Sequence, residues 1–195
     1  MRTAVFLQAR LASKRFPRKV LAKLGDSTVI ETAMERLRSI PCDDYVIVTD
    51  WESEGELGAL ANRHDWLWFG GESDDVMRRF IDAAGRFHVD VIVRATADNP
   101  LVDVELGKQL LAIQLEFTGD STRALGATPG VAVEVVARSA LARWWPSASR
   151  GEREHVMPAV YQYGRSNVLW WHRKYRMSVS IDTLEDLERV EGLLS

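Results

Sequence analysis

The chain has 195 residues, of which 46% are hydrophobic and 27% charged, and a net charge of −3. This composition is that of a globular protein and excludes disordered and fibrous classes, and the length suits one domain spanning residues 1–195. Cys42 is the sole cysteine, which excludes an intrachain disulfide, so we expect a reducing, cytoplasmic compartment. The sequence has no run of 18 apolar residues and its first apolar run is too short for a signal peptide, so we expect no membrane partner.

Positive charge is concentrated at the N-terminus. Residues 1–25 contain seven of the 25 lysines and arginines and no acid, whereas the rest of the chain is acidic. Such local segregation is typical of an anion-binding site and is too restricted for a surface that wraps nucleic acid. A solvated basic loop is the alternative that charge alone leaves open.

Strand-like apolar runs alternate with helical periodicities through the first half of the chain. In chain order, the sequence predicts a strand at 3–8, a loop containing Pro17, a helix begun by a Thr28–Glu31 capping box, a strand at 45–49, a helix capped by Ser53, a short strand at 67–69 and a helix opened by Asp74.

The second half continues the alternation less regularly. It predicts a strand at 91–95, a helix from Asp103 with Leu106, Leu110, Ile113 and Phe117 inward, a loop at 119–130, a strand at 131–136, a helix capped by Ser139, a helix at 153–163, strands at 168–172 and 179–181, and a helix at 184–194 begun by a Thr183–Asp186 capping box. The near-continuous apolarity of 91–95 suits the middle of a parallel sheet.

This alternation predicts an α/β fold with a doubly wound, mostly parallel sheet. Ligands bind beyond the carboxyl ends of the strands in such sheets. We therefore expect the functional site at the loops that follow Gln8, Thr49, Phe69 and Thr96.

The loop at 8–19 has the composition of a triphosphate site. Its small residues Ala9, Ala12 and Ser13 let backbone N–H groups approach an anion, and its cations can neutralise phosphate charge. The loop has neither the GxxxxGK spacing of a Walker loop nor the GxGxxG of a dinucleotide fold.

Five segments, in the same order, resemble the cytidylyltransferases that activate acidic sugars: the CMP-sialic acid and CMP-KDO synthetases and, most nearly, their spore-coat polysaccharide relatives. Residues 9–19 are similar to that family's ARxxSxRxPGK, 71–80 to G(D/E)xxDVLxR(F/Y), 93–103 to VRxT(G/x)DxPL(I/V)D, 152–158 to EREHVTP and 181–187 to VDTPEDL.

Two positions depart from the family pattern. Arg18 replaces the glycine before the lysine, where its side chain could crowd the phosphates or add a cation to them. Ala132 stands where a GxDxE turn has its aspartate, and the missing carboxylate could remove a metal or substrate contact.

The resemblance implies a Rossmann-like nucleotide-diphospho-sugar transferase that converts CTP and an acidic sugar to a CMP-sugar and pyrophosphate in surface polysaccharide biosynthesis. Six residues match the nucleotide-binding positions: Ala9, Arg10, Ser13, Arg15, Lys19 and Arg79. Among these, Arg10 and Lys19 are implied to be catalytic.

The resemblance also implies a magnesium site on Asp98 and Asp182, with Asp98 catalytic, and sugar contacts from Glu134, Arg153 and His155. Two carboxylates with triphosphate oxygens suit Mg²⁺, which keeps few protein ligands. From the residues alone, Asp98 is equally a turn aspartate and Asp182 a helix-capping partner.

Two other function classes remain open: a glycosyltransferase or other nucleotide-sugar enzyme on the same fold, and a non-catalytic nucleotide-binding partner protein. Release of pyrophosphate from CTP distinguishes both from a cytidylyltransferase. A nucleic-acid partner is not expected, because aromatic residues are not interleaved with the basic run. The sequence is compatible with a homodimer.

Overall fold

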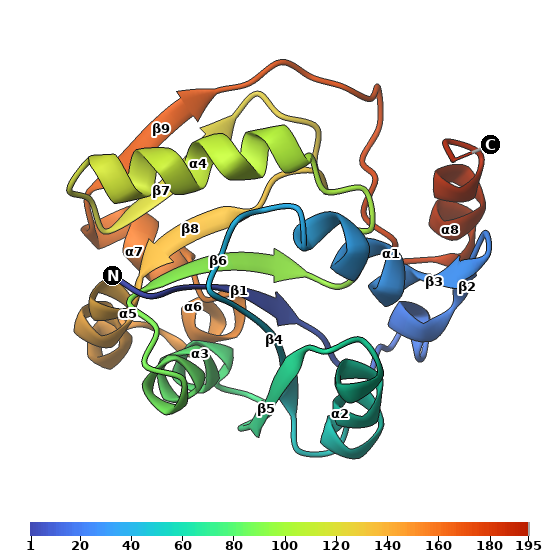
Figure 1. The fold of residues 1–195 in the computed structure, drawn as a ribbon, viewed down its shortest axis with the longest axis horizontal. Helices are drawn as coiled ribbons and strands as arrows, with labels where there is room; N and C mark the ends of the chain where they lie inside the picture. The colour runs from blue at the N-terminus through green and yellow to red at the C-terminus, as the bar shows by residue number, and fades with distance from the viewer. Residues whose placement is uncertain (195) are drawn as a thin grey trace.

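A computed structural model of the protein describes residues 1–194 and is built around a seven-stranded sheet (Figure 1). The strand order is β5-β4-β1-β6-β8-β7-β9. The bounds are β1 Thr3–Gln8, β4 Asp44–Asp50, β5 Leu67–Gly71, β6 Val91–Thr96, β7 Ser121–Leu125, β8 Glu134–Ala137 and β9 Ser166–Trp170. A separate hairpin pairs β2 (Lys23–Leu24) with β3 (Ser27–Thr28).

Helices cover both faces of the sheet. They are α1 Val29–Leu37, α2 Glu54–Arg63, α3 Val76–Arg86, α4 Val104–Glu116, α5 Arg138–Trp144, α6 Arg150–His155, α7 Pro158–Tyr163 and α8 Leu184–Glu191, with short 3-10 turns η1 Lys19–Leu21 and η2 Trp145–Ser147. Within residues 1–194, none of these helices has both the length and the apolar character that a membrane crossing requires.

The directions of the strands confirm the predicted sheet. Parallel pairing joins β1 to β4 and β6, β4 to β5, and β7 to β9. Strand β8 is antiparallel to both of its neighbours and is the reversed strand of an otherwise parallel sheet. Residues 4–7 of β1 are completely buried because this strand has a neighbour on each side and helices above and below.

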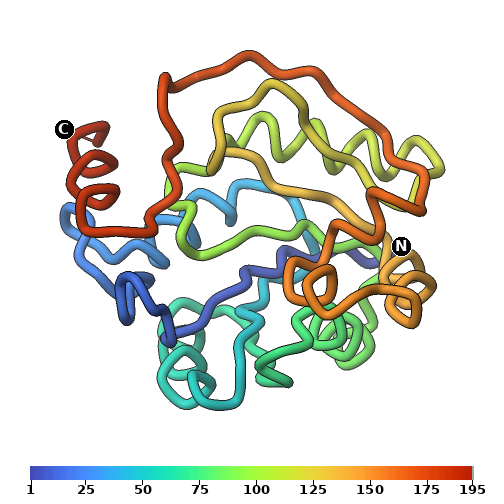
Figure 2. The backbone as a smooth tube through the Cα atoms, turned by 180° about the vertical axis from the view of Figure 1, so that it is seen from behind, coloured from blue at the N-terminus to red at the C-terminus, as the bar shows by residue number. Residues whose placement is uncertain are grey.

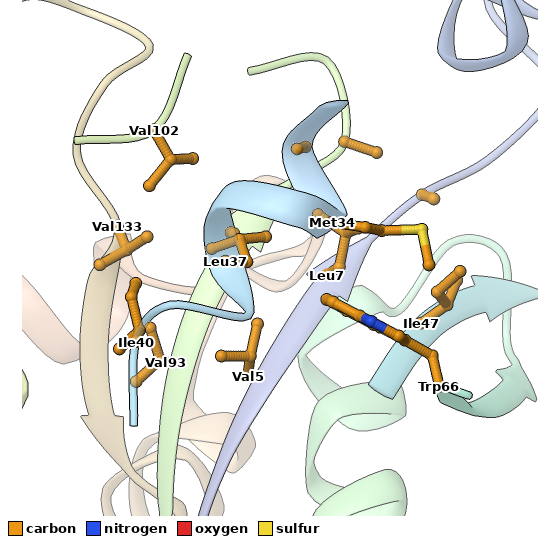
Figure 3. Close-up of a cluster of buried hydrophobic side chains, with 14 of the residues drawn as sticks. Val5, Leu7, Met34, Leu37, Ile40, Ile47, Trp66, Val93, Val102 and Val133 are labelled. Atoms are coloured by element: carbon orange, nitrogen blue, oxygen red, sulfur yellow. The ribbon is translucent and has the colours of Figure 1, made fainter. Parts of the chain in front are cut away.

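Two apolar layers result from the alternation of side chains along the strands. One layer joins Val5, Leu7 and the neighbouring strands to α1, α2 and α4, and Figure 3 shows Met34 and Leu37 of α1 within it. The other layer lies under α3, α5 and α7, where Phe6 packs edge to face on Phe80 with their ring centroids 5.5 Å apart.

A third cluster ties the end of the chain to its beginning. Helix α8 lies beside the β2–β3 hairpin (Figures 1 and 2), and Val190 of α8 shares a buried cluster with Leu24, Val29, Val179 and Ile181. This contact brings the segment before α8 back to the carboxyl ends of β1 and β6.

The predicted boundaries fail mainly in the second half. Residues 121–125, expected as a loop, form β7, and the helix expected at 153–163 is two helices separated at Val156, whose φ is 69°. Residues 179–181 form no strand, and Phe117 is 53% exposed instead of inward. Strand β7 depends on contacts with distant segments, because Thr122 pairs with Val135 of β8 and with Asn167 of β9.

The predicted helix starts have mixed outcomes. The Thr28–Glu31 and Thr183–Asp186 capping boxes are both present. Helix α3 is capped by Asp75 instead of Asp74, and α5 already includes Ser139 because it begins at Arg138. Ser53 stands before α2 but its side chain makes no capping bond.

Candidate functional site

A cavity of about 720 Å³ opens at the carboxyl ends of β1 and β6. Residues 8–15 of the first loop and 96–98 after β6 line this main cavity, together with Lys19 and Asp182. The main cavity therefore lies at two of the four expected loops, those after Gln8 and Thr96, and its role as the functional site stays a prediction. The loops after Thr49 and Phe69 do not line it in the described chain.

Two hydrogen bonds close the base of the loop at residues 8–19, which we call the basic loop. The Arg18 N–H donates to the Leu11 carbonyl at 3.0 Å, and the Leu11 N–H donates to the Ser53 hydroxyl at 3.0 Å. The Ser53 side chain therefore binds the basic loop and does not cap helix α2. Of the proposed nucleotide residues here, Ala9 is buried, Ser13 is half-buried and Arg10 is exposed, and all three line the main cavity.

Arg18 adopts the backbone conformation for which glycine is favoured. Its φ is 58°, in the left-handed region, which a non-glycine residue occupies at an energetic cost. Its guanidinium pairs with Glu56 of α2, and Arg18 is absent from the lining of the main cavity. The side chain therefore neither crowds this space nor adds a cation to it.

Three residues far apart in sequence meet at the edge of the main cavity. The Lys19 ammonium lies 2.7 Å from Asp98 Oδ2 and 2.8 Å from Asp182 Oδ1. The Ile181 N–H donates to the Asp98 carbonyl at 2.8 Å, so the backbone itself holds the two aspartates together. We call Lys19, Asp98 and Asp182 the site triad.

In the site triad, the negative charges of the two carboxylates are balanced by neighbouring cations. The hydrogen bond from Lys19 holds the pKa of Asp182 below its ordinary value, and Arg15, 3.1 Å from the same carboxylate, adds to the effect. The Lys19 ammonium lies between the two carboxylates that the family resemblance implies for a magnesium site, and metal binding there stays a prediction.

The donor set fits a divalent cation of the kind that keeps water and phosphate ligands. Asp98 and Asp182 converge on one point, and residues 1–194 contain no group of three or more His, Cys, Asp or Glu side chains placed to hold a metal. Two carboxylates without further protein ligands is the arrangement expected for Mg²⁺ on a triphosphate.

Arg79 of α3 lines the main cavity, but its guanidinium already donates hydrogen bonds to the protein backbone. It is 2% exposed and donates hydrogen bonds to the carbonyls of Glu72, at 2.7 and 3.0 Å, and Ser73, at 3.2 Å. Burial lowers the pKa of its guanidinium, an effect that Asp50 partly opposes. Arg79 thus fixes the turn before α3, and a nucleotide contact stays a prediction.

A second cavity of about 330 Å³ adjoins the main one at Thr96. Glu134 lies in it, paired with Arg94 of the neighbouring strand and accepting a hydrogen bond from the Tyr161 hydroxyl at 2.6 Å. Burial, and then the adjacent Glu134 carboxylate, raise the pKa of Tyr161. We call Arg94, Glu134 and Tyr161 the strand cluster.

The two remaining candidates for sugar binding, His155 and Arg153, lie in different places. His155 lines the main cavity, as does Glu154, whose carboxylate is 4.0 Å from Arg10. Arg153 lies outside the lining of both cavities: it stacks over Trp145 at 4.6 Å and pairs with Asp75 at 3.6 Å. Its role in sugar binding stays a prediction.

Sequence reasoning did not select Arg94 or Arg123, which both line the second cavity. A charged residue inside the apolar run of β6 was the available signal for Arg94. Arg123 lay in a segment that was expected to be a loop, so its place over the Tyr161 ring, at 4.3 Å, could not be anticipated. Ala132 also lines this cavity, so the missing carboxylate falls here and not at the site triad.

The doubly wound sheet and a cation-rich cavity at its carboxyl edge are features that suit an enzyme acting on a nucleotide. The family model for cytidylyltransferases matches residues 4–193. The chain therefore belongs to the cytidylyltransferase family and is an enzyme of that class.

Three relatives have similar sequences along much of the chain. The chain is 36% identical to the protein MJ1063 of Methanocaldococcus jannaschii, with 83% of this chain and 68% of the other covered. It is 30% identical to the spore coat polysaccharide biosynthesis protein SpsF of Bacillus subtilis, over 96% and 84% of the two chains. It is 31% identical to the 3-deoxy-manno-octulosonate cytidylyltransferase of Nitratiruptor sp., over 58% and 48%.

Among solved structures, a cytidylyltransferase from Leptospira borgpetersenii superposes with a TM-score of 0.91 at 26% identity. The superposition covers 98% of this chain and 85% of the other. The arrangement of β1 to β9 is thus that of an experimentally determined cytidylyltransferase.

Proposed function

We propose that this enzyme transfers the cytidylyl group of CTP to an acidic sugar, with Mg²⁺, to give a CMP-sugar for surface polysaccharide synthesis. The observation that carries the proposal is the site triad at the edge of a cavity rich in cations. The similarity to SpsF and to 3-deoxy-manno-octulosonate cytidylyltransferases supports the choice of sugar and pathway.

Arg10, Arg15 and Lys19 bind the triphosphate. They neutralise the charge that grows on pyrophosphate as it leaves, which is electrostatic stabilisation of the transition state. The backbone N–H groups of the basic loop, with Ala9 and Ser13 beside them, orient the phosphates. No covalent protein nucleophile is needed, because the sugar hydroxyl attacks the α-phosphorus in line.

Asp98 and Asp182 hold the divalent cation when it is bound. A cation held there would polarise the α-phosphate and make the attacking hydroxyl more acidic. The two aspartates suit this role because their positions are fixed by the bond between the Ile181 N–H and the Asp98 carbonyl.

The acidic sugar occupies the second cavity. Arg94 and Arg123 bring two positive charges to its lining and Glu134 one negative charge, so the cavity has a net positive charge that favours a carboxylate-bearing acceptor. His155 lines the main cavity, where it contacts the attacking hydroxyl of the sugar. Thr96 lines both cavities, which supports a reaction between an acceptor in one cavity and a nucleotide in the other.

Pyrophosphate release tests the proposal. CTP, ATP, GTP and UTP are each supplied with Mg²⁺ and with sialic acid, KDO or a related acid as acceptor, and we expect release with CTP and one acid. CTP should also raise the midpoint of thermal unfolding more than the other three, because a ligand of the folded state stabilises it in proportion to its occupancy. Equal shifts and no release with any acid would contradict the proposal.

Calorimetry locates the triphosphate. Arg10→Ala and Lys19→Ala should each weaken CTP binding by at least about tenfold, since each removes a charge-assisted contact. Lys23→Ala, at an exposed position of β2 outside both cavities, is the matched control and should bind as the parent protein does. Unchanged affinity in both cavity variants would remove the basic loop as the triphosphate site.

A further inference from the structure

Lys19 occupies the position that the proposed function gives to a metal. Its ammonium is shared by Asp98 and Asp182, at 2.7 and 2.8 Å, and its side chain is only 12% exposed. Hydrogen bonds hold the backbone of this residue, since the Lys19 N–H donates to the Phe16 carbonyl and its own carbonyl accepts from the Ala22 N–H, whereas the ammonium is held by its ion pairs alone.

The proposed roles of this cluster conflict in the arrangement seen. Asp98 and Asp182 are to hold a divalent cation while Lys19 is to hold phosphate. A divalent cation bonded to both carboxylates would lie within a few ångströms of the Lys19 ammonium, because Mg²⁺–oxygen bonds are only about 2.1 Å long. Two positive charges that close repel strongly in a partly buried site. The ammonium must therefore leave before both carboxylates can hold the metal.

We infer that Lys19 is a placeholder cation that couples metal binding to triphosphate binding. Its ammonium stabilises the two carboxylates until a triphosphate offers it another anionic partner. Lys19 then moves to the phosphates and the metal takes its place. This inference rests on the proposed function for the identity of the ligand, which is a complex of a divalent cation with a nucleoside triphosphate.

The coupling is reciprocal. A metal that arrives alone must compete with the ammonium, and a triphosphate that arrives alone meets a Lys19 still held by two carboxylates. The site is therefore built to take up the two ligands as a unit.

Lys19, and not Arg15, controls this exchange. Arg15 contacts only Asp182 of the pair, and its side chain is 68% exposed, so water readily replaces that contact. Asp98 has Lys19 as its one ion-pair partner within residues 1–194. Removal of Lys19 frees Asp98 completely and Asp182 partly.

Binding of Mn²⁺ alone tests the inference, without nucleotide or sugar. Free Mn²⁺ is measured by electron paramagnetic resonance in titrations of the parent protein, Lys19→Met and the control Lys23→Met. We expect Lys19→Met to bind Mn²⁺ at least about tenfold tighter than the parent, a coupling in the usual range. Lys23→Met should match the parent. Unchanged affinity in Lys19→Met, as for a lysine that only binds phosphate, would overturn the inference, and so would weaker affinity, as for a structural one.

Thermal unfolding gives a second readout. Without metal, Lys19→Met should unfold at a lower temperature than the parent, because two carboxylates lose their shared cation, and Mg²⁺ should raise its midpoint more than it raises that of the parent. Lys19→Gln, which keeps a polar side chain, serves in both measurements if the methionine variant does not fold. Equal Mg²⁺ shifts in parent and variant would contradict the inference. None of these measurements contains CTP, so they can fail or succeed independently of pyrophosphate release.

Discussion

The site triad and the strand cluster are both small groups of opposite charges at the same edge of the sheet, yet they are built differently. Lys19, Asp98 and Asp182 come from three segments outside the strands, and the Asp182 side chain is 40% exposed. Arg94 and Glu134 are direct partners in the register of β6 and β8, with side chains 13% and 27% exposed.

The difference determines what each group can do. In the site triad, Lys19 can exchange its partners, because only side-chain ion pairs join it to the two aspartates. In the strand cluster, Arg94 is held by Glu134 and by Gln8 Oε1 at 2.9 Å, and Glu134 by Tyr161, so every charge has fixed partners. Chemistry that requires exchange of cations suits the first group, and the shaping of a cavity wall suits the second.

The largest effect is expected on turnover. Asp98→Asn and Asp182→Asn keep the shape of the side chain but remove a metal-binding charge, so each should lower the rate of pyrophosphate release by at least about 100-fold. Both variants should still fold, with a midpoint of thermal unfolding that falls only modestly, since Lys19 keeps the other carboxylate as its partner. Asp26→Asn, in the exposed turn of the β2–β3 hairpin, is the control and should keep full activity. Full activity in either site variant would remove the site triad from the reaction.

The next effect concerns stability and belongs to the strand cluster. Arg94→Met leaves the Glu134 carboxylate partly buried with only a hydroxyl partner, which should cost about 2 kcal/mol of unfolding free energy, less than for a fully buried pair. Urea denaturation measures the loss. The double variant Arg94→Met/Glu134→Leu should regain most of it, since no charge is then unpaired. If exposed Arg165→Met destabilises the protein equally, the strand cluster has no special role in stability.

A smaller effect is expected at the third member of that cluster. Tyr161→Phe removes the hydrogen bond to Glu134 but keeps the ring under Arg123, so the free energy of unfolding should fall by about 1 kcal/mol. Combined with Glu134→Leu, the same change should cost less than it does alone, because the bond is already gone. Additive losses in urea denaturation would show that the two residues are not coupled.

The smallest expected effect is on how the unfolding free energy depends on pH, which should differ between variants of the site triad and of the strand cluster. The pKa of Asp182 is lower in the folded protein than in the unfolded chain, chiefly through Lys19, so its contribution to stability is present above its ordinary pKa of about 3.9 and is lost as the pH falls. Lys19→Met should reduce that loss without abolishing it, because Arg15 remains. Tyr161→Phe should lose the same amount of unfolding free energy as the parent protein when the pH falls. Unfolding free energies between neutral pH and acid compare the three proteins.

The sequence determined the alternating fold, the capping boxes at Thr28 and Thr183, and the basic loop after β1, because periodicity, caps and local charge depend on neighbouring residues. It also supplied Asp98 and Asp182 through the family resemblance. Where each strand and helix ends was less well specified in the second half, since the polar strand β7 is stabilised by its partners and not by its own pattern.

Only the tertiary structure decided which residues meet. The packing of α8 on the β2–β3 hairpin brings Asp182 to Asp98, and the reversed strand β8 sets Glu134 opposite Arg94. The left-handed backbone at Arg18 turns that side chain toward Glu56 and away from the main cavity. These contacts join positions tens of residues apart, and their free energy comes from burial and strand pairing that exist only once the whole sheet has formed.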